Sequence, residues 1–301
     1  CYEMAIQQIE VYPVTLGYQE VCKVVETGAE TEKLQVGDMV YASIGHREEA
    51  IINEEESEGA TTTFPFVGVS IAGVGPFKIP QGVAAEDAAQ AILAATALNA
   101  IRRSRMQLGD NIVILGQGPV GLLLGMEAEI AGAGRIIAAD LYDERLEFSK
   151  KLASAIALNP ARDDIVERVM AETDRDGADI VFDCAGAQEG LRDALKMVRY
   201  GGKIVVVAMH RQPLSQVVLG SDFHLREIEV LSAQGEGKES MTYPWKRRRN
   251  IEYFFSLLAQ GKMSTRSLIT HRLDFEKIGA AYQLIDREPR KVGIVHLAFQ
   301  S

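Results

Sequence analysis

Apolar and polar positions follow two different patterns along this chain. From about residue 108 to residue 235, short apolar runs with the length of buried strands alternate with longer stretches of helical spacing. Several runs, such as IVIL, IVFDC and IVVVA, are apolar throughout, which is typical of parallel strands covered by helices on both faces. The pattern predicts strands at residues 111–115, 135–139, 155–158, 179–184, 203–208 and 227–232, and helices at residues 119–131, 143–152, 163–172 and 188–199. Gly201-Gly202 is expected to end the last of these helices.

Six strands with intervening helices indicate a doubly wound α/β domain, which we expect over residues 97–235. The first 96 residues have a different pattern, with short strands at 20–25 and 38–42 separated by frequent glycines, which is typical of a small β-rich domain. An alanine-rich helix is predicted at residues 84–103. The tail, residues 236–301, is too short for a domain; we expect it to return to residues 1–96 and leave a cleft between two bodies.

A glycine motif joins the first predicted strand of the α/β domain to its first helix. GxGxxG alone is a weak signal, but here a strand precedes it and a helix follows, as in dinucleotide-binding folds. The tight turn, the approach of a pyrophosphate to the backbone and close helix packing each require a glycine, and the amides at the helix start face the phosphates. A proline suits the first helical turn, where an N–H has no partner. The residues expected to contact the cofactor here are Gly116, Gln117, Gly118, Pro119, Val120 and Gly121.

Asp140 ends the second predicted strand, 24 positions after Gly116. A carboxylate there accepts hydrogen bonds from the adenosine ribose and repels a 2′-phosphate, which favours NAD over NADP. The alternative to a dinucleotide-binding loop at Gly116–Gly121 is a glycine-rich turn in an ordinary α/β protein. The loops after the fourth and fifth strands are expected to approach the ribose and the nicotinamide, through Ala185 and Gly186 and through Ala208 and Met209.

The composition, 47% hydrophobic and 25% charged, is that of a globular protein. A net charge of −10 argues against nucleic acid or an anionic membrane as partner, since both require basic surfaces. No apolar run reaches the roughly 18–20 residues of a membrane span, and no secretory signal pattern opens the sequence. Three cysteines without a CxxC pair suggest reduced thiols, so we expect a cytoplasmic protein. We expect its partner to be a small-molecule substrate.

Four stretches resemble the medium-chain dehydrogenase/reductase superfamily: GYQEVCKV from Gly17, VGDMV from Val36, the nucleotide block, and GGKIVVV from Gly201. The resemblance covers nearly the whole chain. It implies a GroES-like catalytic domain built from both chain ends, a central Rossmann domain, and hydride transfer at the nicotinamide. It also implies that Arg145 covers the adenine, although a solvated helix surface is an alternative for Arg145, and that two copies form a homodimer.

Departures from the family pattern concern its zinc. Zinc-dependent members have GHExxGxV where this chain has GYQEVCKV, so Tyr18 and Gln19 occupy the positions of the zinc-binding histidine and its neighbouring glutamate. No strong ligand stands near Ile92 or Leu93, where another zinc ligand is expected, and the four-cysteine structural lobe is missing. We therefore predict no catalytic metal. The chain resembles the zinc-free branch that includes bacteriochlorophyllide-type hydroxyethyl dehydrogenases, also through FHL at Phe223 and SAQ at Ser232.

Without a metal, side chains or water must take the hydroxyl proton of an alcohol. Tyr18 is the first candidate; its alternative role is to fill the space left by the metal. His210 follows the fifth strand at the carboxyl edge of the sheet, where such folds bind ligands, and is the second candidate; a loop histidine bonded to backbone is its alternative. Gln19, Thr96 and Trp245 are expected to line the substrate site, with core packing as the alternative for Thr96.

The predicted function is an NAD-dependent, zinc-independent oxidoreductase that interconverts a secondary alcohol or polyol-like substrate and its ketone. Two alternatives remain: a quinone or enoyl reductase of the same superfamily, and a non-catalytic NAD-binding relative.

Overall fold

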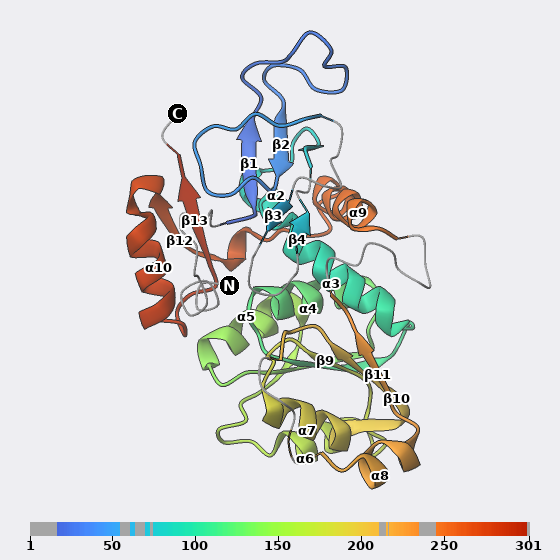
Figure 1. The fold of residues 1–301 in the computed structure, drawn as a ribbon. Helices are drawn as coiled ribbons and strands as arrows, with labels where there is room; N and C mark the ends of the chain where they lie inside the picture. The colour runs from blue at the N-terminus through green and yellow to red at the C-terminus, as the bar shows by residue number, and fades with distance from the viewer. Residues whose placement is uncertain are drawn as a thin grey trace. The chain divides into compact units, whose positions relative to one another are not determined.

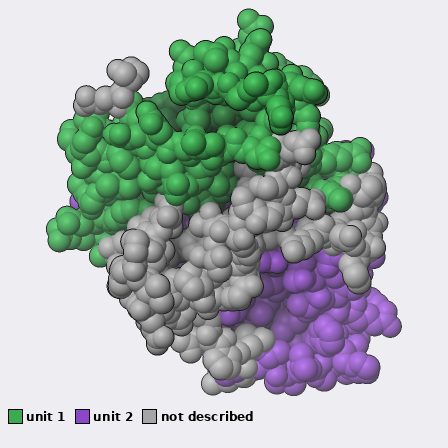
Figure 2. All heavy atoms as spheres, turned by 45° about the horizontal axis from the view of Figure 1, so that its top comes forward, with its two compact units in different colours: residues 1–92, 236–287, 295–301 green, residues 93–235, 288–294 purple. Residues whose placement is uncertain are grey.

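The computed structural model describes residues 17–54, 61–63, 70–72, 75–210, 215, 217–234 and 245–299. The chain divides into two compact units (Figure 2). Unit 1 comprises residues 1–92, 236–287 and 295–301, and unit 2 comprises residues 93–235 and 288–294. The boundaries expected from the sequence, 1–96, 97–235 and 236–301, differ from these mainly in residues 288–294, which are grouped with unit 2.

Unit 2 contains a six-stranded parallel sheet with strand order β11-β10-β9-β6-β7-β8 (Figure 1). The chain crosses from β8 at one edge to β9 beside β6, so strand order reverses between β6 and β9. The predicted doubly wound sheet is confirmed. Its strands are β6 (Asn111–Leu115), β7 (Arg135–Ala139), β8 (Ile156–Leu158), β9 (Ala178–Asp183), β10 (Val198–Val206) and β11 (Glu229–Ser232).

Helices cover both faces of this sheet, α4 and α5 on one side and α6 and α7 on the other (Figure 1). The strands can be apolar throughout because neither face meets water: Val113, Ile137 and Val181 are all at most 1% exposed within one core cluster. The helices are α3 (Ala91–Ser104), α4 (Pro119–Ile130), α5 (Asp143–Ala153), α6 (Ile165–Glu172), α7 (Gln188–Met197) and α8 (Leu219–Asp222).

The expectation that Gly201-Gly202 ends a helix is wrong. Helix α7 ends at Met197, and both glycines lie inside β10. The register on β9 shifts between Val198 and Lys203, and Gly201 has a φ of +63°. A Cβ on Gly202 would lie 3.1 Å from the carbonyl oxygen of Asp179. The two glycines therefore form an irregularity within the strand, where the backbones approach closely.

Unit 1 is built from small antiparallel sheets. One has the order β1-β2-β5, and two further pairs join β3 with β4 and β12 with β13. Helix α10 lies beside β12 and β13 (Figure 1). The elements are β1 (Glu20–Lys23), β2 (Met39–Ala42), β3 (Thr61–Thr63), β4 (Ser70–Ala72), β5 (Phe77–Lys78), α2 (Ala85–Ala88), α9 (Arg247–Ala259), β12 (Ile269–Asp274), α10 (Ile278–Arg287) and β13 (Ile294–Ala298).

A buried carboxylate ties the C-terminal part of unit 1 to α2. Asp87 is 5% exposed, and its Oδ1 accepts hydrogen bonds from the backbone N–H of Thr265 (2.6 Å) and of Arg266 (3.0 Å). Its Oδ2 lies 3.0 Å from Nε of Arg266. The single helix predicted at 84–103 is interrupted after α2, where the N–H of Gln90 bonds to the carbonyl of Asp87 and tightens the chain. No helix within the described ranges is long and apolar enough to cross a membrane.

Candidate functional site

The turn between β6 and α4 can be built only with glycines at two positions. Gly116 has a φ of +90°, and a Cβ there would lie 2.9 Å from the backbone nitrogen of Ala185. A Cβ on Gly121 would lie 2.0 Å from the carbonyl oxygen of Gly116. A Cβ on Gly118 would meet no atom of the described residues within 4 Å. Gly118 caps α4 without a side-chain hydrogen bond, and Pro119 begins the helix. This arrangement leaves room for an anion at the helix start.

Asp140 connects the end of β7 to the glycine loop. Its Oδ2 accepts a hydrogen bond from the backbone N–H of Gln117 (2.7 Å), and its Oδ1 accepts one from the N–H of Tyr142 (2.9 Å). The Nη1 of Arg145 lies 3.8 Å from Oδ2. Because an ionised carboxylate has about four acceptor positions, these contacts leave capacity for ribose hydroxyls.

The side chain of Gln117 points into the protein rather than out of the loop. It is 1% exposed; its Nε2 donates to the carbonyl of Ile114 (2.9 Å), and its Oε1 accepts from the hydroxyl of Ser149 (2.7 Å). Gln117 therefore fastens the glycine loop to α5, and its side chain is not available to a cofactor in this arrangement.

Arg145 is not a freely solvated helix residue. Its guanidinium lies 5.0 Å from the ring centre of Tyr142, and its Nη2 donates to the carbonyl of Pro289 (2.8 Å). The guanidinium of Arg290 lies 5.7 Å from the same ring. Two cations thus contact the Tyr142 ring beside Asp140, and residues 288–294 complete this side of unit 2.

The loops after β6, β9 and β10 meet at the carboxyl edge of the sheet, where strand order reverses. Gly116 approaches Ala185 as described, and a Cβ on Gly186 would lie 3.1 Å from the carbonyl oxygen of Met209 and 3.3 Å from Cβ of Ala208. The structure therefore brings these predicted cofactor residues together at the place where doubly wound sheets bind ligands.

His210 is held by a buried aspartate that the sequence analysis missed. Asp183 is fully buried at the end of β9, and its Oδ1 accepts hydrogen bonds from the N–H groups of Ala185 (3.1 Å) and Gly186 (2.9 Å). Its Oδ2 lies 2.5 Å from Nε2 of His210. The alternative prediction, that His210 is bonded to the backbone, is wrong for Nε2, which contacts a carboxylate. Asp183 could have been predicted from the sequence, because an acidic residue that ends an apolar strand is the same pattern that identified Asp140.

In unit 1, the backbone at Tyr18 is fixed by two hydroxyls. Its carbonyl oxygen accepts hydrogen bonds from Oγ of Ser43 (2.9 Å) and from the hydroxyl of Tyr41 (3.3 Å). The Oε1 of Gln19 is buried, and no described residue donates a hydrogen bond to it. The next residue, Glu20, is 6% exposed, and burial raises the pKa of its carboxyl to about 7. Sequence reasoning identified Tyr18 and Gln19 but not this buried glutamate.

The positions that hold zinc in the family pattern do not fit zinc here. Tyr18 and Gln19 offer a phenol and an amide, and Ile92 offers only a hydrocarbon side chain, 6% exposed. Among the residues that the structure describes, no three His, Cys, Asp or Glu side chains come together as a metal site. Structural and catalytic zinc sites use thiolate, imidazole and carboxylate ligands.

The two other predicted substrate residues belong to different units. Thr96 is half-buried on α3, one turn before Asn99, whose amide donates to the carbonyl of Gln234 (2.9 Å). Trp245 is half-buried just before α9; the guanidinium of Arg249 lies 3.9 Å from its ring centre, and the ring of Tyr253 lies 5.9 Å from it. Trp245 therefore packs on its own helix.

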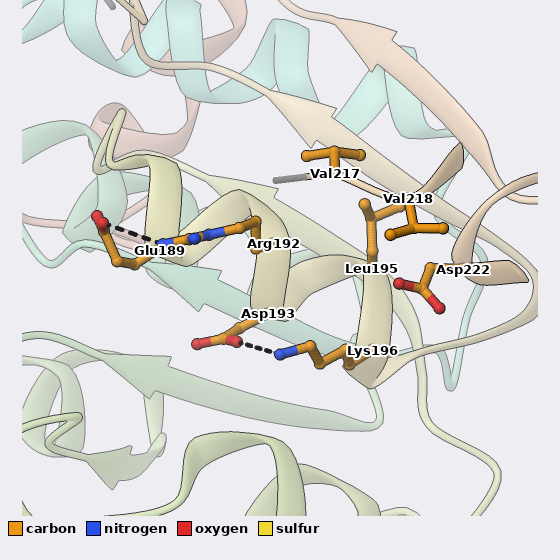
Figure 3. A pocket seen from close by; sticks show the side chains of 8 residues that line it. All are labelled: Glu189, Arg192, Asp193, Leu195, Lys196, Val217, Val218 and Asp222. Carbon is orange, nitrogen blue, oxygen red and sulfur yellow. Dashed lines mark hydrogen bonds and ion pairs between the residues drawn. The ribbon is translucent and has the colours of Figure 1, made fainter. Parts of the chain in front are cut away.

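A cavity of about 340 Å³ in unit 2 contains none of the predicted site residues (Figure 3). Two ion pairs on α7 line it, Arg192 with Glu189 (3.1 Å) and Lys196 with Asp193 (3.3 Å). These four charges are paired with each other along the helix, and Asp222 also lines the cavity.

The known proteins to which this chain is similar are dehydrogenases. Residues 119–246 match the family model described as zinc-binding dehydrogenase. The chain is 27% identical over 281 residues to D-guloside 3-dehydrogenase of Escherichia coli (strain K12), covering 88% of this chain and 77% of that protein. It is 29% identical over 280 residues to (R,R)-butanediol dehydrogenase of Bacillus subtilis (strain 168), covering 88% and 75%.

The structure is similar to that of the alcohol dehydrogenase TADH from Thermus sp. ATN1, with a TM-score of 0.79 and 25% identity over 99% of this chain and 89% of that one. The expected α/β class, with a Rossmann and a GroES-like domain, is thereby confirmed. In sequence and in fold the chain is thus similar to zinc-type alcohol and polyol dehydrogenases of the medium-chain dehydrogenase/reductase superfamily.

Proposed function

We propose that the protein is an NAD-dependent, zinc-independent oxidoreductase that interconverts a secondary alcohol or polyol-like substrate and its ketone. The observation that supports this best is the assembly of the glycine loop, Asp140 and the loops after β9 and β10 at one edge of the sheet. The relatives, named as dehydrogenases of alcohols and sugar derivatives, support the substrate class.

The cofactor would lie along this edge. Its pyrophosphate would lie at Gly118 and the start of α4, and its adenosine ribose would bond to Asp140. A 2′-phosphate would meet the carboxylate of Asp140, which favours NAD. When bound, NAD supplies the hydride acceptor, and the chain's own residues bind it, orient it and handle the proton.

The proton requires side chains because the donor set at Tyr18, Gln19 and Ile92 does not fit zinc. Tyr18 and His210 are the candidates for groups that contact the substrate or the cofactor. Asp183 holds Nε2 of His210 and so determines which ring nitrogen carries a proton when the imidazole is neutral.

The experiment is a survey of turnover by nicotinamide absorbance, with NAD and NADP against secondary alcohols, polyols, ketones, quinones and enones. The proposal predicts NAD-linked oxidation of secondary alcohols or polyols. NADPH-linked reduction of quinones or enones would favour the reductase alternative, and cofactor binding without any turnover would favour a non-catalytic relative.

A further inference from the structure

Asp183, the last residue of β9, holds two loops of unit 2 at once. Its carbonyl oxygen accepts hydrogen bonds from the backbone N–H groups of Val207 (2.9 Å) and Ala208 (2.9 Å), which follow β10. Its carboxylate accepts the N–H groups of Ala185 and Gly186, which follow β9. One fully buried residue therefore fixes the backbone of both loops at the carboxyl edge of the sheet.

The imidazole of His210 is placed by this aspartate and is still reached by solvent. Its Nε2 lies 2.5 Å from Oδ2 of Asp183, and the His210 side chain is 17% exposed, against 0% for Asp183. Because a carboxylate only accepts hydrogen bonds, Nε2 carries the proton of this contact, and Nδ1 of the neutral ring is an acceptor. Within the described residues, the contact with Asp183 is the one hydrogen bond of this ring.

The strand order places this imidazole on the side of the glycine loop opposite to Asp140. Strand β6 carries the glycine loop and lies between β7 and β9. With the pyrophosphate at the start of α4 and the adenosine ribose at Asp140 after β7, the other half of a dinucleotide extends over the ends of β9 and β10. The step is short, because a Cβ on Gly116 would lie 2.9 Å from the nitrogen of Ala185, in the loop that Asp183 holds. All of these residues belong to unit 2.

We propose that Asp183 and His210 bind the nicotinamide riboside half of the cofactor, with Nδ1 of His210 accepting a hydrogen bond from it. Asp183 is a positioning residue, which holds the ring and keeps its proton on Nε2. The nicotinamide riboside has two kinds of donor, the carboxamide NH2 and the ribose hydroxyls, and both fit a neutral imidazole nitrogen. The inference rests on the nicotinamide cofactor of the proposed function and is independent of the alcohol substrate.

The first test, His210→Gln, removes the acceptor and keeps the donor. The amide nitrogen of glutamine can replace Nε2 towards Asp183, while no atom replaces Nδ1. We expect the dissociation constant for NADH to rise about fivefold or more, measured by isothermal titration calorimetry. The dissociation constant for ADP, which has the adenosine and the phosphates alone, should change less than about twofold. ADP-ribose separates the two donors, because a loss shared by ADP-ribose assigns the hydrogen bond to the ribose and a loss confined to NADH assigns it to the carboxamide.

The second test, Asp183→Asn, concerns the positioning role. The asparagine oxygen can still accept from Ala185 and Gly186, but its NH2 donates to Nε2 and so moves the ring proton to Nδ1, which then donates instead of accepting. The dissociation constant for NADH should again rise about fivefold or more. A variant with both changes should bind NADH no more weakly than His210→Gln, since the two residues act together. A purely structural role would add to the loss and would weaken ADP binding too, because the Ala185 loop contacts Gly116.

The matched control is His224→Gln, the same chemical change at an exposed position of unit 2, which should bind all three ligands as the wild type does. If Asp183→Asn does not fold, as judged by thermal melting, His210→Gln decides alone. NADH binding by His210→Gln within about twofold of the wild type, or an equal loss for ADP, would overturn the inference and leave the proposed function in place. A wild type that binds neither NADH nor ADP would reject the proposed cofactor and this inference with it.

Discussion

Two aspartates at the ends of β7 and β9, the strands on either side of β6, hold the candidate cofactor site in shape. Asp140 accepts two backbone N–H groups after β7, and Asp183 accepts two after β9 and also contacts His210. A buried carboxylate is unfavourable unless hydrogen bonds compensate for its lost hydration, and loop N–H groups without partners are unfavourable for the same reason. Each aspartate therefore stabilises a loop and at the same time places negative charge at the ligand edge.

Asp140→Asn tests the role of this charge in cofactor choice. The amide keeps the shape and one acceptor oxygen, but the charge that disfavours a 2′-phosphate is lost. We expect the ratio of NADPH to NADH dissociation constants to fall at least tenfold, measured by nicotinamide fluorescence titration. Asp176→Asn, at an exposed position, is the control. An unchanged ratio would show that Asp140 does not select the cofactor.

Tyr18→Phe tests proton transfer by the phenol. The carbonyl of Tyr18 keeps its bonds from Ser43 and Tyr41, because these involve only the backbone of residue 18. We expect kcat for alcohol oxidation to fall at least tenfold, about 1.4 kcal/mol in the barrier. Tyr200→Phe, on the surface, should leave kcat unchanged. If Tyr18→Phe turns over at the wild-type rate, the tyrosine only fills space.

The sequence alone was enough to predict those candidate site residues whose positions depend only on adjacent segments of the chain. The glycine loop and Asp140 are recognisable because a strand, a turn and a helix fix their spacing. The contact of Asp183 with His210 depends instead on how β9 pairs with β10: Asp183 lies opposite Val206, so the chain just after β10 lies beside it. Such pairing is decided by tertiary packing, which a single sequence does not specify.

At the scale of elements, the fully buried strands were the most predictable. Strands β6 and β7 have the predicted bounds because strands covered on both faces are apolar from end to end. The start of β10 was missed because its first half, Val198 to Gly202, contains a charged residue, Arg199, and two glycines and departs from regular pairing. The break between α2 and α3 was missed because alanines favour a helix on both sides of it.

Helix α4 contains an ionisable group that weakens it at neutral pH. Glu127 is 2% exposed, neither of its carboxylate oxygens has a hydrogen-bond partner in the described part of the chain, and burial raises its pKa well above the usual value. Because the pKa is raised in the folded state, the stability contributed by the protonated form is complete below the unfolded pKa of about 4.5 and is lost as the pH rises.

Glu127→Gln should therefore raise the melting temperature at pH 8, with a gain in the free energy of unfolding of about 1 kcal/mol or more, and the gain should shrink towards pH 4. Thermal unfolding across this pH range measures it. Glu129→Gln, exposed on the same helix, is the matched control and should change little. A gain that does not depend on pH would contradict the assignment of the effect to ionisation.

At the scale of the whole molecule, we expect a homodimer. In the part of the chain that the structure describes, β11 is an edge strand of the six-stranded sheet, and such an edge is a template for another strand. Large apolar side chains are exposed on and beside it: Val230 is 48% exposed, Leu225 70% and Leu219 61%. Pairing of two β11 edges across a twofold axis would cover this surface.

Light scattering after size-exclusion chromatography should give twice the mass of the chain. Val230→Lys places a charge in the expected interface and should shift the protein towards the monomer while its NADH binding is retained. A monomeric wild type would contradict this expectation, and a dimer that Val230→Lys leaves intact would place the interface elsewhere.

We propose that the protein oxidises an alcohol with a nicotinamide cofactor and its own side chains, without zinc. The most direct measurement is the rate of NAD reduction with a secondary alcohol or polyol, in a preparation whose zinc content has been determined by elemental analysis and reduced further by a chelator. We predict turnover that is unchanged as zinc falls far below one equivalent per chain. Turnover that tracks the zinc content and returns when zinc is added would show that the protein is a zinc enzyme.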